Sequence, residues 1–354
     1  MPFTSLGLSP SLLIALSDQK YNAPFPIQIQ AIPAILNRKD VLGIAPTGSG
    51  KTAGYVLPIL MNLQGNTSNK NRHVNVLVLV PTRELSVQVG EVFNIFSKYL
   101  PQKIKTMAVY GGVSINPQLM GMQGVNVLVA TPGRLLELID SNAVHLSQID
   151  TLVLDEADKM LNLGFAEEMN KIFALLPIKR QNLLFSATLI DDVNNINQVL
   201  LRKPLVIKIE EEILNINLIS QIAYFVSEEN KGPLLRYLIR QNNIKQVLVF
   251  ASSVYKADNV SDKLRKNGID AMAIHSKKSQ GARTEALSKF KSGKLRVLVA
   301  TDLMARGIDI KNLPHVINYE LPRSPKDYIH RIGRTGRAES PGEAISFISP
   351  DDQH

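Results

Sequence analysis

The segment Ala45–Thr52 reads APTGSGKT and directly follows the apolar run Val41–Ile44. Its glycines allow backbone N–H groups to turn toward phosphate oxygens, as in a phosphate-binding loop between a strand and a helix. In this pattern Lys51 reaches the β- and γ-phosphates and the Thr52 hydroxyl binds Mg²⁺. Ala45 replaces the usual first glycine, and the GKT triplet disfavours the other interpretation, a plain glycine-rich turn before a helix. The expected nucleotide contacts are Pro46, Thr47, Gly48, Ser49, Gly50, Lys51 and Thr52.

Short apolar runs recur on both sides of this loop, separated by segments of helical length. Candidate strands lie at 41–44, 76–80, 106–110, 127–129, 151–154 and 182–185, and again at 247–250, 271–274, 296–299, 315–318 and 344–348. Buried runs of Val, Ile and Leu with helices between them indicate parallel βαβ units. Two such series predict an α/β protein with two doubly wound parallel sheets.

The stretch 206–220 separates the two series. It carries the acidic cluster Glu210–Glu212 together with Asn215 and Asn217, and its pattern is neither a clean strand nor a long helix. We therefore predict a first domain at 1–210, a linker at 211–217 and a second domain at 218–354.

The composition is that of an ordinary globular chain. Of 354 residues, 45% are hydrophobic and 20% charged, and 40 Lys and Arg against 31 Asp and Glu give a net charge of +9. A polyanionic partner suits this balance, but the charge alone does not establish one. Because there is no cysteine, disulfides and thiolate metal sites are excluded. With no signal peptide and no apolar run near the ~20 residues of a membrane span, we expect a cytoplasmic protein without a membrane segment.

A second unusual string, Asp155-Glu156-Ala157-Asp158, follows the apolar run at 151–154. A carboxylate at a strand end, here Asp155, can hold Mg²⁺, largely through water. The neighbouring Glu156 is suited to orient and deprotonate an attacking water. Alone, three acids in four residues would predict a solvated turn. With a phosphate loop about one hundred residues upstream, they predict the second half of a nucleotide site.

Most polar or glycine-rich strings follow an apolar run directly. In open α/β sheets ligands bind beyond the carboxyl ends of the strands, so we expect these strings to gather at one edge of each sheet.

The strings APTGSGKT, PTREL, TPGR, DEAD, SAT and HRIGRTGR occur in this order and resemble those of the DEAD-box RNA helicases. The resemblance covers essentially the whole chain. GGVSINPQ at 111–118, KRQNLLFSAT at 179–188, HSKKSQGART at 275–284 and LPHVINYELP at 313–322 are most similar to the bacterial RhlE-type subgroup. The resemblance implies two tandem RecA-like domains, ATP and Mg²⁺ as cofactors, and a monomeric core that binds single-stranded or short duplex RNA with little sequence specificity.

The family has an adenine-reading segment before the phosphate loop, which corresponds to residues 1–29 here. By resemblance Gln28 bonds the adenine edge in both directions, and its carboxamide has the needed donors and acceptor. Tyr21 is placed to stack on the base, although core packing explains it equally well, and Phe3 is expected to anchor the segment. Phe25 stands where the family usually has threonine, and we expect it to perturb local packing more than the glutamine contact.

The second half has no GKT string and must contribute to the same nucleotide site in another way. By resemblance Arg334 and Arg337 are arginine fingers that neutralise charge on the γ-phosphate. Asp309 resembles the residue that bonds the ribose hydroxyls, and Gly307 allows close backbone approach. Residues implied to couple the acidic string to lobe closure are Asp158, Ser186, Thr188 and His330.

The implied RNA contacts are small hydroxyls, glycines and a few arginines, which suit phosphate and sugar contacts without sequence readout. They are Pro81, Thr82, Arg83, Glu84, Gly111, Gly112, Thr131, Pro132, Gly133 and Arg134 in the first half, and Ser252, Gln280, Arg283, Thr301 and Arg306 in the second. Each string alone reads as a surface turn. In the family, the helix that begins at TPGR bends one RNA strand and thereby opens a short duplex.

Three functions therefore remain open at the level of sequence. The first is an RNA-dependent ATPase that unwinds short duplexes, the second an ATP-gated RNA clamp with little unwinding, and the third a DNA helicase, which the DEAD and SAT strings and Gln28 disfavour. The chain stops at SPDDQH, directly after its last expected strand. Family members usually continue into another helix, so we expect a truncated or unusually short member.

Overall fold

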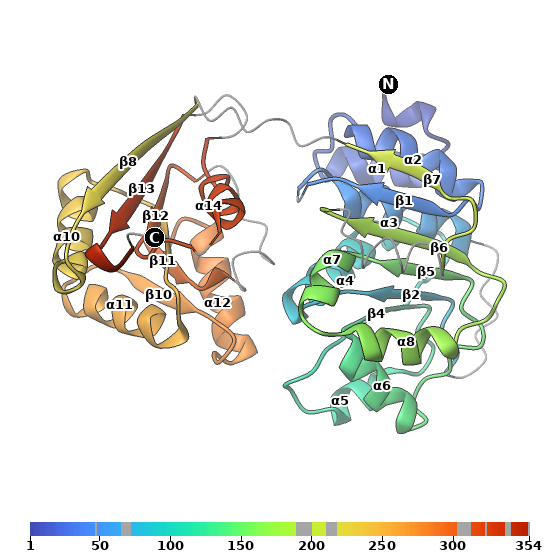
Figure 1. The fold of residues 1–354 in the computed structure, drawn as a ribbon. Helices are drawn as coiled ribbons and strands as arrows, with labels where there is room; N and C mark the ends of the chain where they lie inside the picture. Colours follow the sequence, from blue (N-terminus) through green and yellow to red (C-terminus); the bar gives the residue numbers. More distant parts are fainter. Residues whose placement is uncertain are drawn as a thin grey trace. The chain divides into compact units, whose positions relative to one another are not determined.

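A computed structural model describes residues 1–46, 48–64, 72–188, 200–209, 218–302, 313–322, 324–336 and 341–352. The chain divides into two compact units, Met1–Glu211 and Glu212–His354 (Figure 1). The expected linker at 211–217 lies outside the described residues, so the domain limits stay a prediction.

The first unit is built on a sheet that, over the described residues, has seven strands in the order β3-β4-β2-β5-β6-β1-β7. All its recorded pairings are parallel. Its strands are β1 Val41–Ile44, β2 Val76–Leu79, β3 Thr106–Val109, β4 Val127–Ala130, β5 Thr151–Leu154, β6 Gln181–Ser186 and β7 Leu205–Lys208.

Helices cover both faces of this sheet (Figure 1). They are α1 Pro10–Asp18, α2 Pro26–Leu36, α3 Lys51–Leu63, α4 Arg83–Ser97, α5 Asn116–Gly121, α6 Pro132–Asp140, α7 Ala157–Asn162 and α8 Ala166–Ala174, with a short 3₁₀ turn, η1, at Phe3–Ser5. Successive strand residues point to opposite faces, so Val76 and Val78 enter the core under α1 to α4 while Leu77 and Leu79 enter the core under α5 to α8.

The second unit has a sheet with six described strands in the order β10-β11-β9-β12-β13-β8, again parallel in every recorded pairing. Helices α10 and α11 contribute to the core on one face and α12 to the core on the other. The elements are β8 Ile219–Phe225, α10 Glu228–Gln241, β9 Val247–Phe250, α11 Val254–Lys266, β10 Ala271–Ile274, α12 Gln280–Lys291, β11 Val297–Ala300, β12 His315–Asn318, α14 Pro325–Ile332, β13 Gly342–Ile348 and η3 Pro350–Asp352. Within the described ranges, no helix combines the length and hydropathy that crossing a bilayer requires.

The expected pair of doubly wound parallel sheets is confirmed, with each expected strand found within two residues. The expectation that 206–220 holds no clean strand is wrong. Strand β7 overlaps its start and β8 begins at Ile219. Both are edge strands: β7 buries only Ile207, and β8 carries the exposed residues Ser220 and Gln221 near its start. Neither therefore shows the continuous apolar run of a central strand.

Candidate active site and nucleic-acid interface

The phosphate loop connects β1 to α3, at the carboxyl end of the central strands. The Ala45 amide donates to the Ser186 carbonyl (3.0 Å) at the end of β6, which continues the sheet into the loop. Gly48 and Gly50 have φ values of +80° and +84°. Side chains rarely adopt this left-handed conformation, so glycine is required at both turns. Gly50 caps α3, whose first residue is Lys51.

Lys51 is buried inside the loop that it follows. Its Nζ donates to the carbonyl oxygens of Ala45 and Pro46, the latter at 3.4 Å. Burial lowers the pKa of Lys51, and the carboxylates of Asp155 and Glu156 partly oppose that effect. The ammonium group thus lies within the electrostatic reach of the acidic string that follows β5.

Asp155 follows β5, and its amide donates to the Leu79 carbonyl (3.0 Å) at the end of β2. Its Oδ2 accepts a hydrogen bond from the Tyr55 hydroxyl (2.8 Å), and both side chains are buried. Burial raises the pKa of Asp155, while Lys51 and the tyrosine bond lower it in part. Burial also raises the pKa of Tyr55 well above its usual value, so the phenol stays a donor.

Tyr55 is missing from the sequence-based site. It lies one helical turn after Lys51 on α3, and the Thr52 side chain opposes part of the rise in its pKa. The signal that could have identified it is the i, i+4 spacing from Lys51, which places both residues on one helix face.

Glu156 adopts the left-handed conformation at φ +54°, which is uncommon for a residue other than glycine. Its Oε1 accepts from Lys159 Nζ (2.8 Å), while Oε2 is buried without a hydrogen-bond partner. Burial raises the pKa of Glu156, and Lys159 opposes the shift. A buried carboxylate oxygen with an open lone pair and a raised pKa is suited to accept a proton. Lys159 is a second residue that the sequence did not suggest.

Asp158 connects the acidic string to the SAT string. Thr188 Oγ1 donates to Asp158 Oδ2 (2.9 Å), and Ser186 Oγ donates to the Thr188 carbonyl (2.7 Å). The two strings follow neighbouring strands, β5 and β6, so these contacts join the ends of both strands.

Of the two residues expected to read the base, Gln28 lies beside the phosphate loop. Gln28 is fully buried on α2; its Nε2 donates to the Gly50 carbonyl (3.0 Å) and its Oε1 accepts from the Phe25 amide (2.9 Å). One N–H and one lone pair of the carboxamide remain beyond these two bonds. Tyr21 packs edge-on against Phe3 and Phe96, at ring-centroid distances of 6.5 and 5.8 Å. Both contacts join Tyr21 to rings of the first unit's core, so the packing interpretation of Tyr21 is supported, while its stacking on a base stays a prediction.

The candidate RNA contacts of the first unit follow β2, β3 and β4. Arg83 Nη1 donates to the Gly112 carbonyl (3.4 Å), and Arg134 Nη2 donates to the Val113 carbonyl (2.8 Å). Arg134 is buried and also pairs with Glu137 (2.8 Å). Both arginines therefore hold the glycine loop. Buried members of the set are Pro81, Glu84, Thr131, Pro132 and Arg134, whereas Thr82, Arg83, Gly111, Gly112 and Gly133 keep exposed surface.

In the second unit, Arg331 fixes α14 to the sheet. It forms a two-pronged pair with Asp302 (2.6 and 2.7 Å) and donates to the Glu320 carbonyl (2.6 Å) and to Asn318 Oδ1 (3.2 Å). Its guanidinium lies 5.0 Å from the Phe250 ring centroid. The helix that carries the histidine–arginine string is thereby held against the ends of β9, β11 and β12.

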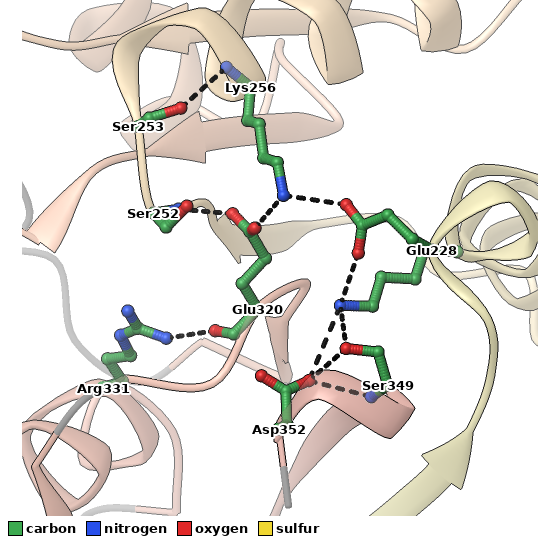
Figure 2. Close-up of polar contacts among 9 residues, drawn as sticks. Glu228, Ser252, Ser253, Lys256, Glu320, Arg331, Ser349 and Asp352 are labelled. Carbon is green, nitrogen blue, oxygen red and sulfur yellow. Dashed lines mark hydrogen bonds and ion pairs between the residues drawn. The ribbon is translucent and has the colours of Figure 1, made fainter.

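The Glu320 carboxylate orients the loop after β9 (Figure 2). Its Oε2 accepts from the Ser252 amide (2.7 Å), and its Oε1 accepts from Lys256, which also pairs with Glu228 (2.8 Å). Burial alone would lower the Lys256 pKa, but the two carboxylates raise it above its usual value. The buried Lys231 continues the network to Glu228 (3.0 Å). The Ser252 side chain is exposed, while its backbone amide is bonded to Glu320.

The site strings of the first unit that follow β1 to β6, and Ser252 and Thr301 of the second unit, lie at the carboxyl ends of their strands, as expected. Other described site residues lie on helices, namely Gln28 on α2, Arg283 on α12 and His330 on α14. In the second unit Arg283 and Arg334 are buried, while Thr301 and His330 are partly exposed. Several expected site residues lie outside the described part of the chain, namely Thr47, Arg306, Gly307, Asp309 and Arg337, and nothing is described of the Gln280 side chain.

The donor set suits Mg²⁺. This ion keeps several waters in nucleotide sites and takes only one or two protein carboxylates together with phosphate oxygens. Asp155 provides one buried carboxylate, held by the Tyr55 hydroxyl, and Thr52 lies in the first turn of α3 directly after Lys51. A phosphate loop facing two buried acids, on the first of two doubly wound units, defines a phosphate-loop nucleotide-binding protein with tandem RecA-like domains.

Comparison with known proteins identifies the family. A DEAD/DEAH box helicase model matches residues 25–196, and a helicase conserved C-terminal domain model matches residues 230–339. The ATP-dependent RNA helicase CshA of Limosilactobacillus reuteri is 39% identical over 99% of this chain and 70% of its own length. CshA of Geobacillus kaustophilus is 37% identical over 98% of this chain and 73% of its own length. This chain covers 64–66% of the length of relatives of the same name from other bacteria.

Solved structures agree. A DEAD box protein from Methanococcus jannaschii is 35% identical with a TM-score of 0.56, covering 99% of this chain and 94% of that one. Dbp5 of S. cerevisiae, bound to RNA and ADP BeF3, is 29% identical with a TM-score of 0.81, covering 99% and 90%. This chain therefore belongs to the DEAD-box family of ATP-dependent RNA helicases.

Proposed function

We propose that this chain hydrolyses ATP at the phosphate loop of its first unit and uses the cycle to bind, locally unwind and release RNA. The observation that carries the proposal is the convergence of Lys51, Asp155 and Glu156 at the ends of β1 and β5. That convergence is joined to the SAT string through the bond between Asp158 and Thr188. A phosphate-binding cation, a metal-binding carboxylate and a buried base are together the parts that phosphoryl transfer to water requires.

The residues of the first unit divide the chemistry among them. Lys51 neutralises phosphate charge. Thr52 and Asp155 would hold Mg²⁺, which would supply further neutralisation of phosphate charge when bound. Glu156 orients the attacking water and accepts its proton through the open Oε2. Gln28 offers its remaining donor and acceptor to the adenine edge, which favours ATP over GTP. Tyr55 keeps the Asp155 carboxylate in one orientation.

The second unit completes the ATPase. Arg334 and Arg337 act as arginine fingers, Asp309 bonds the ribose, and Gly307 permits close approach of the backbone. His330 and the Asp158–Thr188–Ser186 contacts couple the nucleotide state to the binding of RNA. Because fingers and phosphate loop belong to different units, hydrolysis requires both units to act on one ATP.

RNA is bound through its backbone by both units. In the first unit the contacts come from the loops after β2, β3 and β4, and in the second from Ser252, Gln280, Arg283, Thr301 and Arg306. Most groups are hydroxyls, backbone amides and arginines, so binding carries little sequence specificity. Glu320 assists by accepting from the Ser252 amide (2.7 Å), and the exposed Ser252 side chain is available to bind an RNA phosphate.

Three finer points complete the proposal. The GGVSINPQ and HSKKSQGART strings support an RhlE-type subgroup, whereas the named bacterial relatives reported above are CshA proteins. The absence of cysteine from the sequence is compatible with a cytoplasmic location. A monomeric core suffices, because every proposed site residue comes from one chain.

Removing the Tyr55 hydroxyl tests the metal assignment. In Tyr55→Phe the Asp155 carboxylate loses the hydrogen bond that the buried phenol donates to it. Loss of a hydrogen bond to a metal-binding side chain typically costs about 10- to 100-fold in metal affinity, so we expect the Mg²⁺ concentration for half-maximal ATPase activity to rise roughly 10-fold. The measurement is a Mg²⁺ titration at saturating ATP and RNA, with Tyr99→Phe, whose hydroxyl bonds the exposed Asp18, as the control. An unchanged Mg²⁺ requirement in Tyr55→Phe would contradict the assignment.

An unwinding assay tests the proposed activity. We expect ATP-dependent strand release from short RNA duplexes, falling steeply as the duplex is lengthened because separation is local. The matched DNA duplex should be opened poorly. Retention of RNA in ATP without strand release would instead indicate an ATP-gated clamp, and equal opening of RNA and DNA would indicate a different kind of helicase.

A further inference from the structure

Phe25 occupies a capping position that its side chain does not use. It precedes the first turn of α2 with φ −70° and ψ 156°, and its side chain makes no capping hydrogen bond. A threonine there, usual in the family, could offer a hydroxyl to a backbone amide in the first turn of the helix. The phenyl ring is also 47% exposed. A large apolar side chain that neither caps the helix nor enters the core points to another role.

The ring packs against the last glycine of the phosphate loop. A Cβ built on Gly50 would lie 2.7 Å from Phe25 Cδ2 and 2.5 Å from Gln28 Nε2, both closer than any real Cβ contact. The Phe25 ring and the Gln28 carboxamide therefore fill the space in which a side chain of residue 50 would stand.

Hydrogen bonds hold the same three residues together. The Phe25 amide donates to Gln28 Oε1 (2.9 Å), and Gln28 Nε2 donates to the Gly50 carbonyl (3.0 Å). Gly50 in turn has φ +84° and caps α3, so its orientation determines where Lys51 and the first amides of that helix point. Phe25 thus acts on the phosphate loop twice, through its ring and through its backbone.

We propose that Phe25 is a positioning residue of the nucleotide site, whose ring holds Gly50 and thereby keeps the phosphate loop in its phosphate-binding conformation. A glycine-rich loop has many accessible conformations, and binding must otherwise restrict them at the cost of affinity. This inference rests on the proposed function in that the loop binds the phosphates of ATP. It differs from a contact with the base, because the ring acts on the loop and on every ligand that the loop binds.

The test uses two ligands and three substitutions. We expect Phe25→Ala and Phe25→Thr to weaken ADP binding roughly 3- to 10-fold. Inorganic tripolyphosphate, which has no base, should be weakened by the same factor. Phe25→Leu, which keeps apolar bulk against Gly50, should retain most of the parent affinity. Dissociation constants are measured by calorimetry or by displacement of a fluorescent ADP analogue from the full chain.

Stability is measured on the same samples without nucleotide. In Phe25→Thr a new capping hydroxyl offsets the lost ring contact, so we expect its melting temperature to stay within roughly 2–4 °C of the parent. Leu175→Thr is the matched control, because Leu175 is 49% exposed and lies at the end of α8, outside the nucleotide-site contacts described above. It should leave both affinities unchanged.

The outcomes separate the inference from the function on which it rests. Unchanged ADP affinity in a folded Phe25→Thr variant would overturn the inference, as would weaker ADP binding with unchanged tripolyphosphate binding, since that pattern places the ring against the base. A parent chain that binds neither ligand would contradict the proposed function as well.

Discussion

Replacing Glu156 with glutamine is expected to stop ATP turnover while prolonging the RNA-bound state. The glutamine oxygen can still accept from Lys159, so α7 and the left-handed turn keep their contact. What is lost is a buried carboxylate that can accept the proton of the attacking water. General-base groups typically contribute 10²–10⁴-fold to a rate, and we expect kcat to fall by about that factor.

Two measurements on Glu156→Gln separate catalysis from binding. Steady-state ATPase assays give the loss in kcat, and RNA dissociation in the presence of ATP should be slower than in the parent, because release follows hydrolysis. Glu167→Gln, which removes the same charge from an exposed position on α8, should change neither. RNA release from Glu156→Gln in ATP as fast as from the parent would show that hydrolysis and release are not coupled.

Replacing Arg334 with alanine is expected to cause the larger loss of turnover with little loss of RNA binding. An arginine finger typically contributes about 10³–10⁵-fold to phosphoryl transfer, because it neutralises charge that develops in the transition state. Lysine is a compact point charge without the planar fork of arginine, so Arg334→Lys should recover only part of the rate. The measurement is kcat under saturating RNA, together with the affinity for RNA in a non-hydrolysable ATP analogue.

Arg331→Ala is the control for Arg334, because both arginines are buried and only three residues apart. Arg331 makes the two-pronged pair with Asp302 and bonds the ends of β12, so its loss should lower the melting temperature of the second unit. Removing one partner of a fully buried pair typically costs about 3–5 kcal/mol, and the cost here is expected to be smaller because the Asp302 side chain is 32% exposed. If Arg334→Ala destabilised the chain as much as Arg331→Ala and kept its turnover when folded, Arg334 would be a structural residue.

The sequence predicted the elements whose signal is local. APTGSGKT and DEAD identify their chemistry within eight and four residues, and the apolar runs located the central strands, because those strands are buried on both faces. The edge strand β8 was missed because its exposed polar residues interrupt the apolar run.

The supporting contacts of the site could not be predicted in this way. Tyr55 and Lys159 are ordinary helix residues in the sequence. Tyr55 contacts Asp155 only because the fold brings α3 next to the end of β5, and Lys159 contacts Glu156 across one helical turn. Phe25 was recognised as a departure from the family, but its contact with Gly50 depends on how α2 packs against the phosphate loop.

The rate of ATP hydrolysis with and without single-stranded RNA tests most directly whether one ATPase is completed by both units and coupled to RNA. We expect slow turnover without RNA and clear stimulation by single-stranded RNA, with much weaker stimulation by DNA of the same sequence. Hydrolysis that is absent under both conditions, or equally fast with and without RNA, would contradict an ATPase that is coupled to RNA.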